Sequence, residues 1–505
     1  MSLLLRGSIA VVTCGLSLCA VAPTVASARA AAATPIPSGV PTSLQAVQGA
    51  PATAHVVSDP TIVPQNPFFA ANGRSNLHND SWMTDAYQIS GPLGRASVTL
   101  SNQIGPSLCG SIAFDKRGRL ITICPSTAQT PKLRLIDPKT LGVIASTDLP
   151  ALAPPVGTPT FQNFTGGGYF FLDQKDQVWS STATSHLLVF AQTADGSGFI
   201  QKRDYDLTRV LTSQERVSSA LLDFQGRLWF VTKKLGRVGI LNTKTGAIKS
   251  IVLGEEIENS FAIDRDGVYI ASDKRMYRFG IDPTGKPRAT WSVRYGNSGI
   301  KKPGQVDAGT GTTPTLMDNG LVAITDNADP MNVVVYRRAI KLEKGQRRTL
   351  CEVPVFTRGA SATENSLISA GRSLIVENNY GYSDPLAVGG GNVISVPGFA
   401  RIDVDETSTA CRVVWTNTKE RAPSVVPKLS TKNGLIYTYT RDRDPSGAQP
   451  WFWTTLDFRT GKTVYKRLAG TGFGFNNNYA GVTLGPDGTA YLGSFGGIIA
   501  LRDGK

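Results

Sequence analysis

The 505-residue chain is poor in the residues that many nucleotide-binding, zinc and membrane proteins depend on. It has only three histidines, charged residues make up 18% of it, and no segment beyond the first 28 residues reaches a long apolar run. A membrane-spanning helix needs roughly 18 or more such residues, so the sequence predicts no membrane span. It also has no P-loop, no G-x-G-x-x-G between a strand and a helix, and no C-x-x-C pair. These absences argue against a nucleotide fold and a zinc site.

Glycine and proline are abundant instead. The chain contains 52 Gly and 30 Pro, and 41% of its residues are hydrophobic. This is a globular composition, because disordered chains carry fewer apolar residues. So many breakers disfavour long helices and are typical of an all-β chain with many turns.

The N-terminal region predicts export. Arg6 precedes the apolar stretch 9–21, and Ala26-Ser27-Ala28 offers a cleavage site, so residues 1–28 are predicted to be a signal peptide. Residues 29–63 are rich in Ala, Pro, Thr and Ser, which predicts a disordered lead. A single domain is expected over 64–505, in a protein that is secreted or held in the cell envelope.

Charge and cysteine use fit that compartment. The formal net charge is +14, which favours an anionic cell-envelope polymer or protein as partner. No clustered basic arm predicts specific nucleic-acid binding, and we expect a monomer. Four cysteines follow the predicted signal, and an even number in an oxidising compartment predicts two disulfides. Cys109 and Cys124 lie at equal distances from a predicted turn at 116–117, and Cys351 pairs with Cys411 by elimination.

One pattern recurs along the chain beyond residue 100: a short apolar strand, a polar turn that usually contains glycine, and a second apolar strand. It occurs eight times, at 111–123, 169–181, 219–231, 260–272, 314–325, 366–378, 428–440 and 481–493. Two further strands usually follow, separated by Asp/Asn-x-x-Thr-Gly turns as in 457–461. Four strands every 40–60 residues are typical of propeller blades.

The repeats therefore predict an all-β propeller of eight four-stranded blades, with seven as the alternative. The last repeat has only one further strand after it, at 496–503. A strand from the N-terminal region, at 96–100, would complete that blade and close the ring.

The strand–turn–strand repeats and the D/N-x-x-T-G turns resemble those of the quinoprotein-like (PQQ-repeat) propellers and of YVTN-type propellers, over about residues 100–505. The resemblance implies the architecture and raises quinone-dependent oxidation as an activity. The chain has no adjacent Cys-Cys pair, no C-x-x-C-H haem site and no regular Trp docking motif, so we do not expect bound PQQ.

The loops that lead into the first strand of each propeller blade converge on one face. Two of them carry the same Glu-Asn-Ser motif, at Glu258-Asn259 and Glu364-Asn365. Their carboxylate and amide oxygens suit Ca²⁺, and they resemble lactonase-type propellers in residue type. As a second interpretation, Glu258 and Glu364 act as an acid–base pair on a sugar or ester. As a third, both motifs are loop caps that bond to neighbouring backbone.

His78 is the one histidine with a catalytic neighbourhood. Asp80 and Asp85 follow it closely, so His78 and Asp80 are further catalytic candidates, although no G-x-S-x-G elbow accompanies them. Three functions stay open at this stage. They are an enzyme of hydrolase or lactonase type acting on a small or sugar-like substrate, a non-catalytic scaffold for envelope material, and a quinone-dependent dehydrogenase.

Overall fold

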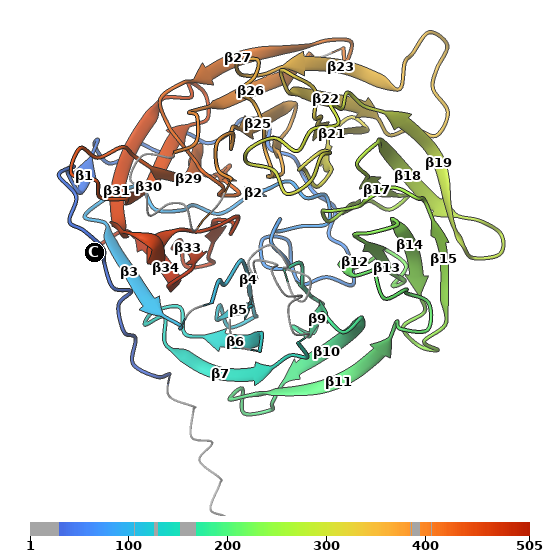
Figure 1. Cartoon of the computed structure of the whole chain (residues 1–505), viewed down its shortest axis with the longest axis horizontal. Coiled ribbons are helices and arrows are strands. Elements are labelled where there is room, and N and C mark those ends of the chain that lie inside the picture. Colours follow the sequence, from blue (N-terminus) through green and yellow to red (C-terminus); the bar gives the residue numbers. More distant parts are fainter. Residues whose placement is uncertain are drawn as a thin grey trace, which may run out of the picture.

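The computed structural model describes residues 30–105, 107–125, 130–151, 168–383, 385, 394–405 and 407–504. The predicted signal peptide 1–28 and most of the Gly-rich segment 384–392 lie outside these residues. Eight antiparallel sheets surround a central channel, as the repeats predicted (Figure 1). No helix among the described residues is long and apolar enough to cross a membrane.

The blades are numbered here in chain order, and each runs from an inner to an outer strand. Blade 1 consists of β4 (Ser111–Phe114), β5 (Leu120–Cys124), β6 (Lys132–Ile136) and β7 (Val143–Asp148), and blade 2 of β8 (Phe171–Leu172), β9 (Val178–Ser181), β10 (His186–Gln192) and β11 (Phe199–Asp206). Blade 3 consists of β12 (Val217–Leu222), β13 (Leu228–Thr232), β14 (Arg237–Leu241) and β15 (Ile248–Val252), and blade 4 of β16 (Ala262–Ile263), β17 (Val268–Ala271), β18 (Arg275–Ile281) and β19 (Pro287–Arg294).

Blades 5 to 8 complete the ring. Blade 5 consists of β20 (Thr315–Met317), β21 (Leu321–Thr325), β22 (Asn332–Arg337) and β23 (Thr349–Pro354), and blade 6 of β24 (Ile368–Ala370), β25 (Ser373–Glu377), β26 (Phe399–Val404) and β27 (Cys411–Asn417). Blade 7 consists of β28 (Lys428–Ser430), β29 (Leu435–Arg441), β30 (Pro450–Asp457) and β31 (Thr463–Thr471). Blade 8 consists of β32 (Thr483–Leu484), β33 (Ala490–Ser494) and β34 (Gly497–Arg502), with β3 (Val98–Gln103) as its outermost strand. A 3₁₀ turn, η3 (Phe473–Phe475), links blades 7 and 8.

The N-terminal closing strand is confirmed. β3 pairs antiparallel with β34 from Val98↔Arg502 to Gln103↔Gly497, so one blade is built from both ends of the described chain. This pairing gives blade 8 its fourth strand and closes the ring. Strands β5, β13 and β21 are buried along their whole length, because blades pack on both of their faces. Outer strands such as β11 are mostly exposed.

Aspartates and asparagines shape the turns that the repeats share. Asp115 Oδ1 accepts hydrogen bonds from the amides of Arg117 and Arg119, both at 2.9 Å, and Asp223 does the same in blade 3. In the outer turns Asp457 Oδ1 accepts from the amides of Arg459 and Thr460. Short acidic or amide side chains favour such turns, since they replace a backbone acceptor.

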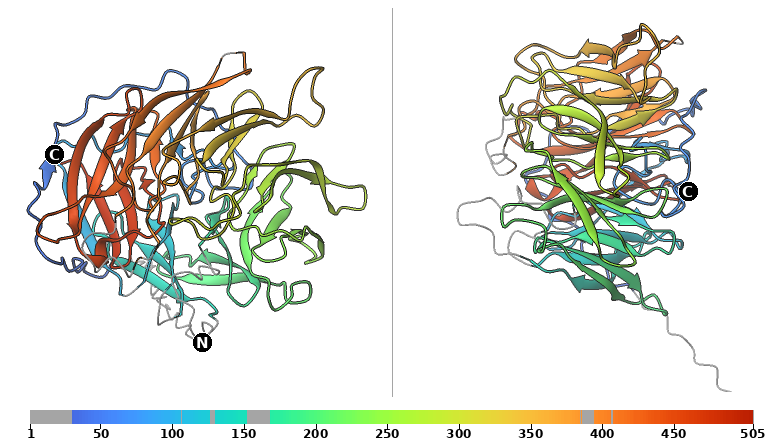
Figure 2. Two further views of the ribbon diagram at one scale, coloured as in Figure 1. Left: turned by 45° about the horizontal axis from the view of Figure 1, so that its top comes forward. Right: turned by 90° about the vertical axis from the view of Figure 1, so that its right-hand side faces the viewer.

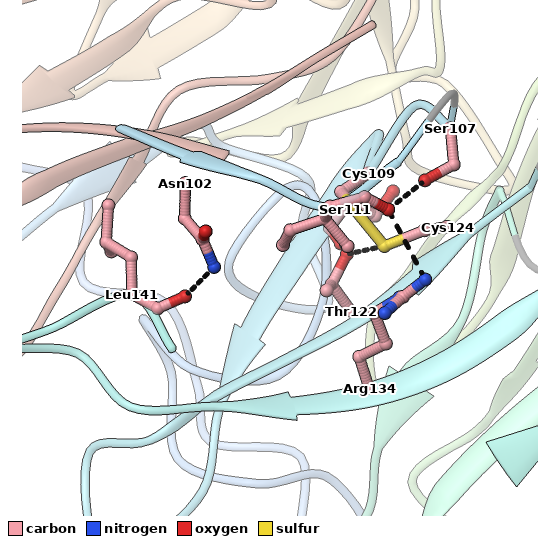
Figure 3. The surroundings of a disulfide bond; sticks show 9 residues. Asn102, Ser107, Cys109, Ser111, Thr122, Cys124, Arg134 and Leu141 are labelled. Carbon is pink, nitrogen blue, oxygen red and sulfur yellow. Dashed lines mark hydrogen bonds between the residues drawn. A yellow bond between two sulfur atoms is a disulfide. The ribbon is translucent and has the colours of Figure 1, made fainter. Parts of the chain in front are cut away.

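Both predicted disulfides are present. Cys109 precedes β4 and Cys124 ends β5, so their bond closes the innermost hairpin of blade 1 (Figure 3). Cys351 lies on β23 and Cys411 on β27, so their bond joins the outer strands of blades 5 and 6. The first disulfide stabilises one hairpin, whereas the second connects two blades.

Residues 30–63, expected to be a disordered lead, instead lie along the propeller as an extended strap. β1 (Val47–Gln48) pairs with β31, and Gly39, Ala52 and Val57 donate backbone hydrogen bonds to blade 7 and its neighbours at 2.7–2.9 Å. The edge of β31 supplies backbone hydrogen-bond partners to residues 30–63, which have little hydrophobic core of their own. The edge-on view shows the blue N-terminal residues gathered on one side of the disc (Figure 2).

Residues 66–87, called the channel segment here, enter the centre of the ring. Their carbonyls accept hydrogen bonds from the inner strands of six blades, at Phe114, Leu172, Ile263, Leu316, Ser369 and Leu429, and the Asn66 side chain donates to Leu222 of a seventh. β2 (Ala86–Tyr87) adds in parallel to β28. The channel edges of the inner strands are therefore occupied by the chain itself, a feature that sequence analysis did not predict.

Candidate functional site

A cavity of about 340 Å³ opens at one mouth of the channel. The channel segment contributes Leu77 and His78 to its wall, and the loops around all eight inner strands contribute the rest. Its charged and polar lining residues include Tyr169, Gln214, Arg216, Ser218, Lys233, Lys234, Glu258, Asn259, Lys301, Gln305, Glu364, Asn365, Ser366, Tyr382, Asn478 and Tyr479. The predicted residues Glu258, Asn259, Glu364, Asn365 and His78 thus meet in one place.

Glu258 belongs to a three-residue ionic cluster. Lys233, which follows β13, places its Nζ 2.5 Å from Glu258 Oε2 and 3.7 Å from Asp307 Oδ2. Burial and a hydrogen bond to Asp307 raise the pKa of Glu258 well above its usual value, although Lys233 opposes the rise. Burial would also raise the pKa of Asp307, but the Glu258 hydrogen bond and Lys233 outweigh it and lower that pKa. Of the two carboxyl groups, Glu258 is therefore the more readily protonated and Asp307 the more readily ionised.

Glu364 has a different environment beside the long loop before blade 5. Its Oε2 accepts a 3.0 Å hydrogen bond from the Val306 amide, and its own amide donates to Asn379 Oδ1. Burial raises the pKa of Glu364 to about 8, against the effect of that hydrogen bond. A carboxyl group with such a pKa keeps its proton at neutral pH and can donate it.

The two asparagines of the repeated motif have structural partners. Asn259 Oδ1 accepts a 3.0 Å hydrogen bond from the Tyr169 hydroxyl. Asn365 Nδ2 donates to Glu377, to Asn379 and to the Val425 carbonyl, which fixes the loop into blade 6. In Asn365 the motif therefore acts as a loop cap, while the glutamate beside it faces the cavity.

His78 is held by Asp85 rather than by Asp80. His78 Nδ1 lies 3.0 Å from both Asp85 oxygens, and the buried Nε2 has no hydrogen-bond partner among the described residues. Because a carboxylate only accepts, Nδ1 carries the hydrogen and Nε2 can accept a proton. Asp80 accepts from the amides of Trp82 and Thr84 and is not among the cavity-lining residues. Burial raises the pKa of Asp80 to about 7.

The donor set fits acid–base chemistry better than a Ca²⁺ site. No group of three or more His, Cys, Asp or Glu side chains in the described ranges is arranged to hold a metal ion. The Lys233 ammonium lies against Glu258, where a bound cation would also have to lie. A calcium ion there would displace that ammonium, since Ca²⁺ takes six to eight oxygen ligands.

Sequence reasoning missed three cavity residues, Lys233, Tyr169 and Lys301, and also Asp307, which contacts Lys233. Lys233 and Tyr169 adjoin repeat hairpins, and Asp307 and Lys301 lie in the 295–314 loop, whose length was the one available signal. Tyr169 stacks on His78 with ring centroids 6.3 Å apart. Burial, followed by the charges of Glu258 and Glu364, raises the Tyr169 pKa above its usual value. Tyr169 therefore lies close to both the imidazole and the glutamates.

The comparisons with known proteins support the architecture. The quinohemoprotein alcohol dehydrogenase from Comamonas testosteroni superposes with a TM-score of 0.51 and 11% identity, over 86% of this chain and 82% of that one. A streptogramin B lyase matches over 80% of this chain and 97% of its own, with 12% identity and a TM-score of 0.39. The virginiamycin B lyase from Staphylococcus aureus matches over 68% and 94%, with 12% identity and a TM-score of 0.38.

No protein-family model and no curated protein matches the sequence. At 11% identity the dehydrogenase shows the propeller fold alone, because propellers carry many unrelated functions. The resemblance to quinoprotein-like propellers is confirmed at the level of architecture.

Proposed function

We propose that the cavity is the active site of a secreted enzyme that acts on a small, sugar-like substrate by general acid–base catalysis. One observation carries the proposal: a carboxyl group that keeps its proton at neutral pH, Glu364, and an imidazole nitrogen without a partner, His78 Nε2, line the same cavity. A proton donor and a proton acceptor in the same cavity are typical of acid–base sites.

Each residue has a role in this proposal. His78 Nε2 takes a proton from the substrate or from an attacking water, with Nδ1–H held by Asp85. Glu364 donates its proton to the oxygen that leaves or gains charge. Glu258, whose pKa is raised by burial, supplies a second hydrogen-bond donor to a substrate oxygen, and Lys233 lies beside it. Tyr169 gives the substrate a flat surface beside the imidazole.

The experiment is a turnover screen of purified protein against esters, lactones and glycosides, with products followed by mass spectrometry. A parallel arm contains EDTA, and another contains added quinone, Ca²⁺ and a redox dye. Glu364→Gln should remove turnover without lowering the melting temperature. Glu343→Gln, on the exposed loop between β22 and β23, is the matched control and should remain active. Full activity of Glu364→Gln would overturn the proposal.

A second candidate is a scaffold for anionic envelope polymers. The loop between β22 and β23 exposes Lys341, Lys344 and Arg347, which favours electrostatic binding. Retention on cell-wall material that weakens as salt rises would support this function. Retention that is insensitive to salt would count against it.

A further inference from the structure

The cavity has two unlike sides. Four cations line it, and they come from blades 3 to 5: Arg216, Lys233, Lys234 and Lys301. Three tyrosines line the rest, and they precede or follow the inner strands of blades 2, 6 and 8: Tyr169, Tyr382 and Tyr479. We call these groups the cationic side and the tyrosine side.

Two cations of the cationic side, Arg216 and Lys301, form no ion pair with a residue in the described ranges, although Asp307 lies nearby. Lys233 is paired with Glu258, and Lys234 with Glu256. Lys301 is exposed and makes no hydrogen bond or ion pair with any residue in the described ranges. Burial raises the pKa of Glu364, and the Lys301 charge opposes that rise, so this ammonium group lies within electrostatic reach of the cavity.

Arg216 extends the same side. Its Nη1 donates to the carbonyls of Ser213 and Glu215 at 2.8 and 2.6 Å, which holds the guanidinium in place. The Lys233 amide donates to the Arg216 carbonyl at 2.9 Å, so the two cationic residues are neighbours. A guanidinium positioned by backbone contacts is suited to bind a planar carboxylate.

The tyrosine side is suited to a hydroxylated ring. Tyr382 and Tyr479 meet edge to face with centroids 5.5 Å apart, and Tyr479 donates to the Gly304 carbonyl at 3.4 Å. Gln214, Ser218 and Ser366 add hydrogen-bonding groups between the two sides. Aromatic surfaces with interspersed polar groups provide both packing and hydroxyl recognition.

We infer that the cavity binds a sugar acid, with its carboxylate on the cationic side and its ring against the tyrosine side. This inference rests on the proposed function and names the substrate class of that site. A neutral sugar would leave Lys301 without an ion-pair partner, and an aromatic acid would make no use of the polar side chains of Gln214 and Ser366. Uronic acids combine both features.

The test uses the full-length protein. D-galacturonate and D-glucuronate are the probes, and D-galactose and D-glucose are their neutral counterparts. Saturation-transfer NMR and titration at neutral pH should show binding of the acids and much weaker binding of the neutral sugars. An aromatic acid, benzoate, forms a third arm. Equal binding of acid and neutral sugar, preferred binding of benzoate, or no binding of the uronates would each overturn the inference.

Variants separate the carboxylate contact from general charge attraction. Lys301→Met should weaken uronate binding about fivefold, which is the upper range for one exposed ionic contact. Lys341→Met, an exposed lysine on the β22–β23 loop, should bind as the unmodified protein does. If both variants lose affinity equally, the attraction is not local and the inference is wrong.

Failure of the sugar-acid inference can be distinguished from failure of the proposed function. Glu364→Gln should still bind uronate, because the inferred carboxylate contact is made on the cationic side and not by Glu364. If the turnover screen finds a neutral substrate that requires Glu364, the enzyme proposal stands and the sugar-acid inference fails. If uronate binds and no turnover follows, the binding inference stands and catalysis fails.

Discussion

His78 and Asp85 form a buried pair inside the propeller channel, with Nδ1 of the imidazole 3.0 Å from both carboxylate oxygens. Lys428, on the inner strand β28, contacts the same carboxylate and also donates to the Leu77 carbonyl at 2.7 Å. The side chains of Asp85 and Lys428 are 0% exposed. A residue that lines the cavity is thus fixed through a charge pair to blade 7.

Asp85→Asn should destabilise the protein strongly. The substitution leaves the Lys428 ammonium buried without its counter-charge, and breaking one partner of a buried pair costs about 3–5 kcal/mol. Chemical denaturation measures the loss. The double variant Asp85→Asn/Lys428→Met removes both charges and should recover part of it. A single variant as stable as the unmodified protein would show that the pair contributes nothing.

Glu377 should make stability fall as pH rises. Burial raises its pKa from 4.5 to about 8, so between these values the unfolded chain has lost a proton that the folded protein keeps. The free energy of unfolding then decreases with pH across that window and levels off above it. Glu377→Gln mimics the protonated form, because Oε1 can still accept from Asn365 and Asn379.

The measurement is thermal or denaturant unfolding at a series of pH values from 4.5 to 9. Glu377→Gln should match the unmodified protein near the acidic end and exceed it above pH 8. Glu364 has a pKa of about 8 for the same reason, so Glu364→Gln should flatten the remaining slope. A slope unchanged in both variants would assign the pH dependence to other groups.

The two disulfides should contribute unequally. Cys109–Cys124 closes a 15-residue separation and Cys351–Cys411 one of 60. In the chain-entropy model these loops correspond to about 3 and about 4 kcal/mol. Cys351→Ala/Cys411→Ala should therefore lower unfolding free energy more than Cys109→Ala/Cys124→Ala. Denaturant unfolding of both variants, with the reduced protein as a reference, measures which variant loses more stability. The reverse order would show that packing around the disulfides matters more than chain entropy.

The propeller could be predicted from sequence because its signals are local. Each repeat carries its own turn residue, such as Asp115 or Asp223, and its own alternation of apolar strand and polar turn. The closing strand was predictable as well, since the last repeat lacked a partner. The strap and the channel segment were not, because their hydrogen bonds go to residues hundreds of positions away, such as Thr431 and Leu429.

The candidate site was predictable only in part. Loops of a propeller converge on one face, which was enough to bring Glu258 and Glu364 together. The partners that set their chemistry, Lys233 and Asp307, lie at different repeat positions and carry no motif. The Asp80 interpretation followed proximity in sequence, whereas the backbone turn places Asp85 on His78 and uses Asp80 to cap the Trp82 and Thr84 amides.

Asp444 should control how tightly the strap is held. Its carboxylate accepts from the Thr42 hydroxyl and from the amide and hydroxyl of Ser43, the latter two at 2.9 and 2.7 Å. Asp444→Ala removes all three hydrogen bonds and leaves the backbone contacts that Gly39 and β1 make with β31. Amide hydrogen exchange over residues 39–48 should then accelerate, because local opening of a weakly packed segment governs exchange there.

A matched substitution distinguishes this effect from general loosening. Asp195→Ala removes an exposed turn aspartate that accepts from Thr193 and Ser197 of its own hairpin, so it should leave exchange at 39–48 unchanged. In Asp444→Ala, residues 52–57 should stay protected, since Ala52 and Val57 donate to Leu93 and Thr431. Unchanged exchange at 39–48 would mean that the β1–β31 pairing alone holds the strap.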